Sequence, residues 1–150
     1  MTISFEPAPA SLSAEYVRLR GMTRANSASE TRLRELGVTA ESWAADIESG
    51  ELIGRAAMDG SRVVGYCFGN TRTGEVVVLA VLPEVEGQGV GRRLLASVSE
   101  ELRRQGHDRL FLGCSADPKV RSYGFYRHLG WTSTGAIDQR NDEVLELVFK

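Results

Sequence analysis

The residues best suited to chemistry form a glycine-rich stretch at positions 86–93, which reads EGQGVGRR. Gly87, Gly89 and Gly91 alternate in it, and residues without a Cβ let the backbone turn tightly and approach a ligand closely. The stretch opens a predicted helix, whose first amide groups lack intrahelical partners and act as outward donors. With the positive end of the helix dipole and the side chains of Arg92 and Arg93, these donors suit phosphate oxygens. The pattern predicts a phosphate site, although a purely structural strand-to-helix turn is the alternative.

Two familiar phosphate-binding loops do not match this stretch, since it contains neither Gly-Lys-Ser/Thr nor Gly-x-Gly-x-x-Gly. It lies between an almost wholly apolar segment, residues 75–82, and the longest predicted helix. The apolar face of that helix consists of Val90, Leu94, Leu95, Val98 and Leu102. Gly106 ends the helix, and residues 109–114 (RLFLGC) predict a second buried strand. The order strand, helix, strand favours a parallel strand pair.

The remaining elements predict an α+β fold in a single domain over residues 1–150. Strands are expected at residues 3–9, 53–59, 62–70, 131–137 and 143–149. Helical spacing places Tyr16, Val17, Leu19 and Met22 on one face, and predicts further helices at 41–47 and 118–129, with an ambiguous stretch between the first two. Together these predict a mixed sheet with helices on both faces.

Composition limits the classes of partner. The chain has 150 residues and a formal net charge of -2, so it is long enough to bury a core and has no field that would attract nucleic acid or an anionic membrane. Cys67 and Cys114 stand in apolar stretches without the companions of a zinc site, so we expect buried thiols and no metal. We expect no targeting leader and no membrane span, because residues 1–10 have no basic start or long apolar run and no later stretch approaches the length that spans a bilayer. We expect a cytoplasmic protein with small-molecule partners.

A second motif follows the glycine-rich stretch. Residues 125–131 read FYRHLGW, and the stretch itself reads Glu86-x-x-Gly89-x-Gly91. Together, and in this order, they resemble the GNAT superfamily of acetyl-CoA-dependent acyltransferases, whose motifs are Gln/Arg-x-x-Gly-x-Gly/Ala and Phe-Tyr-x-x-x-Gly-Phe. Glu86 stands where that family has Gln or Arg. The resemblance covers residues 62–131 best.

The resemblance implies a GNAT-like mixed, mostly antiparallel sheet with a central parallel strand pair, and acetyl-CoA as co-substrate. In the family the central strand bulges, its backbone contacts the pantetheine arm and the thioester carbonyl, and the glycine loop binds the pyrophosphate. Lys119 and Ser122 stand where the family commonly has Asn and Ala. Carried over residue by residue, the cofactor-binding positions are Leu79, Ala80, Val81, Gly87, Gln88, Gly89, Val90, Gly91, Arg92 and Lys119.

Two residues match catalytic positions of the family. Tyr126 matches the proton donor to the departing CoA sulfur, because a neutral phenol can supply that proton; core packing beside Phe125 is the alternative. Glu75 opens the apolar strand and matches the base of the histone-modifying branch, whereas a solvated turn residue is the alternative. Glu84 is the next candidate base. Weaker candidates are His107, His128 and Cys114.

The resemblance therefore implies an N-acetyltransferase. It would move an acetyl or short acyl group to a primary amine of a small-molecule or peptide acceptor, by direct attack in a ternary complex. Tyr66, Phe68 and Trp43 do not identify that acceptor, and a homodimer is compatible with the sequence. Two readings remain open beside it: a CoA-binding sensor or regulatory module without efficient chemistry, and a structural α/β domain with an accidental glycine turn.

Overall fold

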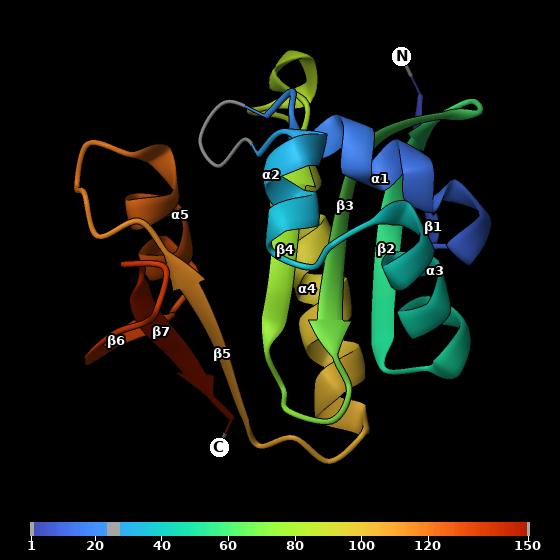
Figure 1. Ribbon diagram of the computed structural model, residues 1–150. Helices are drawn as coiled ribbons and strands as arrows, with labels where there is room; N and C mark the ends of the chain where they lie inside the picture. The colour runs from blue at the N-terminus through green and yellow to red at the C-terminus, as the bar shows by residue number, and fades with distance from the viewer. Residues whose placement is uncertain (1, 24–27, 150) are drawn as a thin grey trace.

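The computed structural model describes residues 2–23 and 28–149. Its strands are β1 (Ile3–Pro7), β2 (Leu52–Asp59), β3 (Arg62–Asn70), β4 (Val76–Val81), β5 (Arg109–Cys114), β6 (Thr132–Ile137) and β7 (Glu143–Val148). Its helices are α1 (Ser13–Arg20), α2 (Glu30–Glu35), α3 (Ala40–Ser49), α4 (Val90–Arg104) and α5 (Arg121–His128), with short 3-10 helices η1 (Ala10–Leu12) and η2 (Pro83–Val85). Figure 1 shows this order, and the predicted α+β class is confirmed.

The strands form two antiparallel sheets, in the orders β1-β2-β3-β4 and β5-β7-β6. Within the described residues, β4 and β5 meet through one parallel bridge between Glu75 and Phe111, where the Phe111 N–H donates to the Gly74 carbonyl at 3.3 Å. Beyond this bridge the two strands diverge (Figure 1). The predicted central parallel pair is therefore not a continuous ladder, and the two strands belong to different sheets.

One face of the first sheet packs against α4, which lies behind it in Figure 1. The apolar helix face predicted from spacing is buried, and its members are Val90, Leu94, Leu95, Val98 and Leu102. The helix comes very close to β3 at Gly69, where an added Cβ would lie 2.8 Å from Cδ1 of Leu102. Glycine at this position therefore allows the close contact between helix and strand.

The opposite face of the sheet packs against α1 and α3, so helices cover both faces as expected. An aromatic cluster of Tyr16, Trp43, Tyr66 and Phe68 fills this layer, with ring centroids 5.0 Å apart for Tyr16 and Tyr66 and 5.9 Å apart for Trp43 and Tyr66. The Tyr66 hydroxyl donates to the Tyr16 carbonyl at 2.7 Å. These aromatic residues belong to the core, and their hydroxyl groups are satisfied within it.

The N-terminal helices differ from expectation at their ends. The helix α1 stops at Arg20, so Met22 lies outside it and is 44% exposed instead of sharing the buried face. The ambiguous stretch holds the short helix α2, whose Ser29 hydroxyl accepts the Arg32 N–H as an N-cap. The helix α5 begins at Arg121, later than the predicted residue 118.

The last strands form an exposed edge. Every residue of β6 is exposed, and β6 pairs with β7 only at Thr132, Ser133 and Ile137 within the described part of the chain. Between these points the register is broken, and Gly135 has a φ of 83°. The edge strand of the second sheet is thus irregular in its middle.

Candidate active site

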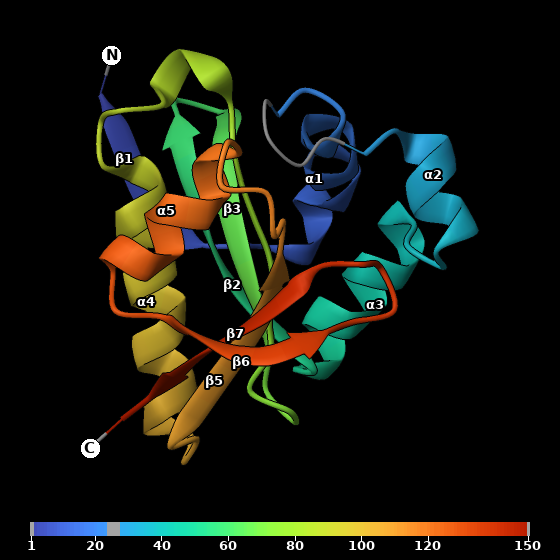
Figure 2. The same ribbon diagram turned by 90° about the vertical axis from the view of Figure 1, so that its left-hand side faces the viewer.

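A cavity of about 290 Å³ lies between β4, the glycine-rich loop and α5. Figure 2, which faces α5 and the second sheet, shows α5 crossing in front of α4. The side of the cavity formed by β4 is apolar, whereas its other end carries glycine backbone and arginine side chains. Its lining consists of Thr23, Leu79, Val81, Val85, Glu86, Gly87, Gly89, Val90, Gly91, Arg92, Arg121, Ser122, Phe125 and Tyr126. The structure thus brings the two sequence motifs to one cavity.

The glycine loop has the backbone conformation that only glycine adopts readily. Gly87 and Gly89 both have a φ of 79°, and Gly89 is the N-cap of α4. Gly89 has no side chain that could cap the helix, so the amide groups of the first turn donate no hydrogen bond to an N-cap side chain. Gly91 is not left-handed, and a Cβ there would lie 3.6 Å from Cζ of Phe125. The loop therefore presents backbone donors and the dipole of α4 to the cavity.

The strand β4 presents alternate residues to the cavity. Leu79 and Val81 line it, whereas Ala80 is buried opposite Tyr66, on the side of the aromatic cluster. The Leu82 N–H donates to the Val64 carbonyl of β3 at 2.9 Å, so by antiparallel alternation the backbone groups of Leu79 and Val81 point away from β3. The register of β3 and β4 shifts at Phe68 and Gly69, which leaves Val77 in a bulge of the kind expected for this strand.

Tyr126 lies on α5 and lines the cavity while being only 8% exposed. Its ring packs edge to face against Phe125 at 5.1 Å and against Trp131 at 6.1 Å between centroids. Burial raises the pKa of the Tyr126 phenol well above its ordinary value. The phenol therefore keeps its proton at neutral pH and can act as a donor.

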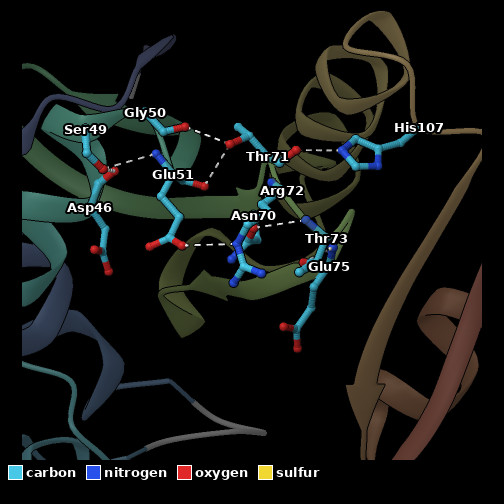
Figure 3. Close-up of polar contacts among 10 residues, drawn as sticks. All are labelled: Asp46, Ser49, Gly50, Glu51, Asn70, Thr71, Arg72, Thr73, Glu75 and His107. Carbon is cyan, nitrogen blue, oxygen red and sulfur yellow. Dashed lines mark hydrogen bonds and ion pairs between the residues drawn. The ribbon is translucent and has the colours of Figure 1, made fainter.

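Glu75 lies at the other end of β4 from the glycine loop and does not line the cavity. The preceding turn is firmly held: the Asn70 side-chain oxygen accepts the N–H groups of Arg72 and Thr73 at 2.9 and 3.1 Å, and His107 Nε2 donates to the Thr71 carbonyl at 2.7 Å. Figure 3 shows the Glu75 side chain pointing away from this network. It is half-buried, and burial raises the pKa of its carboxyl group.

Glu75 belongs to a group of charged residues that sequence reasoning missed. Its carboxyl group interacts electrostatically with Arg140 and Asp138. The carboxyl group of Asp142 interacts in the same way with Asp138, Arg140 and Arg20. The Asp138 Oδ1 accepts the N–H groups of Arg140 and Asp142 at 2.9 and 3.0 Å, which holds the β6–β7 turn. No local pattern could reveal this group, because its members come from α1, the residue before β4 and the β6–β7 turn.

The other predicted residues lie outside the cavity lining. Glu84 makes an exposed ion pair with Arg62 at 2.7 Å, and that hydrogen bond lowers the pKa of Glu84. Gln88 and Lys119 are exposed on the surface, and Gln88 Nε2 donates to the Glu84 carbonyl at 3.5 Å. Burial raises the pKa of Cys114 to about 11, so it remains a thiol. His128 is exposed near the end of α5.

An ion pair across the cavity lining was also missed. Glu86 Oε1 lies 3.2 Å from Arg121 Nη1, and both side chains line the cavity. Glu86 belongs to the glycine-rich loop and Arg121 is the first residue of α5, so the contact joins the two motifs. Only the tertiary structure places these two residues together.

In residues 2–23 and 28–149, no cluster of three or more His, Cys, Asp or Glu side chains is arranged to hold a metal ion. None of the helices in the same ranges is both long enough and apolar enough to cross a bilayer.

Solved structures similar to this chain carry the same architecture. PaiA N-acetyltransferase from Thermoplasma acidophilum, solved with coenzyme A, is 14% identical with a TM-score of 0.74, over 99% of this chain and 100% of that one. YncA from Salmonella typhimurium, solved with its cofactor acetyl-CoA, is 17% identical with a TM-score of 0.75, over 100% and 95% of the two chains. The ribosomal-protein-S18-alanine N-acetyltransferase from Escherichia coli is 14% identical with a TM-score of 0.72, over 99% and 95%.

A match to a family model identifies the family of the chain, which structural similarity at these low identities does not. No curated protein sequence matches this chain. The family model described as the acetyltransferase (GNAT) family matches residues 13–131, which include the glycine loop, β4 and α5. With both motifs of that family at one cavity, the chain belongs to the GNAT acetyltransferase family.

Proposed function

We propose that this protein transfers an acetyl or other short acyl group from acyl-CoA to a primary amine. One observation carries the proposal. The glycine loop at the start of α4 and the protonated Tyr126 line the same cavity. The amides of residues 87–92 and the side chain of Arg92 would bind the pyrophosphate. The CoA and acetyl-CoA complexes of PaiA and YncA support the choice of cofactor.

The reaction would be a direct attack in a ternary complex. The pantetheine arm would lie along β4, where the backbone groups of Leu79 and Val81 point away from β3. An N–H directed at the thioester carbonyl would stabilise the developing oxyanion by about 3 kcal/mol. As the carbon–sulfur bond breaks, Tyr126 would give its proton to the departing sulfur, which leaves as the CoA thiol.

The acceptor would be an amine that arrives as an ammonium ion. Three carboxyl groups, on Glu75, Asp138 and Asp142, are grouped with the guanidinium groups of Arg20 and Arg140. Their excess of acidic groups suits a positively charged acceptor, whether a small molecule or a peptide. Since Glu75 is outside the cavity lining, it would remove the amine proton through water.

The test is the release of CoA thiol from acetyl-CoA with a panel of amino acids, polyamines, aminoglycosides and peptides, followed by the intact mass of each product. Thiol release that depends on the amine, with the mass of one acetyl group added, is the expected result. Binding of acetyl-CoA without turnover on any amine would support the CoA-binding sensor instead. Absence of CoA binding would refute both functions.

A further inference from the structure

The ion pair between Glu86 and Arg121 lies at the phosphate end of the cavity. The Arg121 side chain is 56% exposed and that of Glu86 only 15%, so the carboxylate lies inside and the guanidinium at the mouth. Both line the cavity together with Gly87, Gly89 and Arg92. A carboxylate thus lies in the part of the cavity whose backbone donors suit an anion.

This arrangement poses an electrostatic problem. Pyrophosphate carries negative charge, and a like charge a few ångströms away opposes its binding, more strongly where solvent is partly excluded. The related motif has Gln or Arg at the position of Glu86, so this chain has an acidic group where the pattern is neutral or basic. Binding of an anion here requires a cation close to Glu86, and Arg121 supplies one at 3.2 Å.

We propose that Arg121 is a pyrophosphate ligand of this protein and that Glu86 is the positioning residue that holds its guanidinium at the cavity mouth; this rests on the proposed binding of CoA. The ion pair uses Nη1 of Arg121. A guanidinium has five N–H donors in a planar fork, so one edge can contact a carboxylate while the other contacts a phosphate. Arg121 comes from α5 and Arg92 from α4, which places cations from two helices in the same lining.

The competing explanation is that the ion pair only attaches α5 to the loop. In that case its loss would displace α5 and affect every ligand that uses the cavity, including one without phosphate. A residue that binds the phosphate behaves differently, because its loss weakens the binding only of compounds that contain that phosphate. A truncated ligand therefore separates the two explanations.

The experiment measures dissociation constants of CoA, dephospho-CoA and pantetheine by calorimetry or competition. The proteins are the wild type, Arg121→Gln, Glu86→Gln and the double variant. Arg104→Gln is the matched control, since Arg104 lies in the last turn of α4 and pairs there with Glu101 at 3.3 Å. Arg121→Gln should weaken CoA and dephospho-CoA by about 10- to 100-fold, the range expected for hydrogen bonds to charged groups, and leave pantetheine within twofold.

The Glu86→Gln change completes a double-mutant cycle with Arg121→Gln. Removing the carboxylate releases Arg121 from its position but also removes a like charge, so Glu86→Gln should change CoA affinity less than Arg121→Gln does. The loss caused by Arg121→Gln should be smaller in the Glu86→Gln background, because there Arg121 is not held at the mouth and offsets no carboxylate charge. Arg104→Gln should bind all three ligands like the wild type.

Several results would overturn the inference. Equal weakening of CoA and pantetheine by Arg121→Gln would show that the ion pair only attaches α5. A loss for CoA without one for dephospho-CoA would assign Arg121 to the 3′-phosphate instead. Unchanged CoA affinity in Arg121→Gln, with strong binding to the wild type, would refute this inference alone, whereas absence of binding to the wild type would refute the proposed function as well.

Discussion

Gly89→Ala should lower both stability and CoA affinity, because Gly89 has a φ of 79° at the N-cap of α4. A residue with a Cβ costs about 1–2 kcal/mol in the left-handed region. No described atom lies within 4 Å of the Cβ position at Gly89, so no steric clash adds to this cost. The free energy of unfolding should therefore fall by about 1–2 kcal/mol, and the melting temperature by roughly 2 to 8 °C for a chain of this size.

The effect on binding follows from the same backbone angle. If the loop relaxes to relieve the strain, the amides of Val90 and Gly91 turn away from the cavity, and loss of even one charge-assisted hydrogen bond weakens CoA by about tenfold or more. Gly91→Ala is the matched control. Gly91 has no positive φ, its Cβ would lie 3.6 Å from Phe125 and Val81 atoms, and alanine favours a helix by about 1 kcal/mol. This variant should keep its stability and its CoA affinity.

The assays are urea unfolding followed by circular dichroism and calorimetric titration with CoA. Two results would refute the reasoning. One is a Gly89→Ala protein that matches the wild type in both stability and affinity. The other is a Gly91→Ala protein that loses more stability than Gly89→Ala.

Three other variants test separate parts of the structure. Tyr126→Phe should lower turnover by about 100- to 10,000-fold while CoA affinity and melting temperature are kept, since only the phenolic proton is lost; unchanged turnover would return Tyr126 to a packing role. Glu75→Gln should lower turnover over about the same range with partial rescue at high pH, where more amine is already deprotonated; parallel pH profiles would exclude it as the base. Because burial raises the folded-state pKa of Glu75 above its unfolded value, its protonated form adds stability at low pH that is lost as pH rises through that pKa. Urea unfolding against pH should therefore show a smaller decline for Glu75→Gln, and an equal decline would contradict this. Gly69→Ala should cost about 1–3 kcal/mol through overpacking, since its Cβ would lie 2.8 Å from Leu102, with CoA affinity unchanged in titration; a neutral effect on stability would show that α4 shifts freely.

Local patterns predicted the elements that form the cavity. The apolar face of α4 and the apolar run of β4 depend on spacing within single segments, and both are present as expected. The parallel strand pair could not be predicted in this way, because its length depends on where β4 and β5 separate in the tertiary structure. The spacing around β4 and β5 cannot show that pairing stops at Glu75 and Phe111. Met22 was misplaced for a local reason, since α1 ends at Arg20.

The site divides in the same way. The glycine loop and Tyr126 could be found from the sequence because each belongs to a contiguous motif, and the structure places both at the cavity. Ala80 illustrates a limit of transferring whole segments, since strand alternation directs its backbone groups to β3, where it pairs with Tyr66. The contact between Glu86 and Arg121 and the charged group around Glu75 join residues from distant segments, so no window along the chain contains their signal.

The two sheets end in four edge strands, and two of these edges, at β6 and at β4, differ in their risk of aggregation. An intact, uncovered edge can pair with other chains and start aggregation. The outer edge at β6 is uncharged and exposed, but its broken register and the left-handed Gly135 interrupt the row of hydrogen-bonding groups that another chain would need. The edge of β4 keeps a regular row at Leu79 and Val81, and the lining of the cavity by α5 shields it. The regular part of the β4 edge thus faces the cavity, where the proposed pantetheine arm would pair with it, while the exposed edge at β6 is poorly suited to pairing.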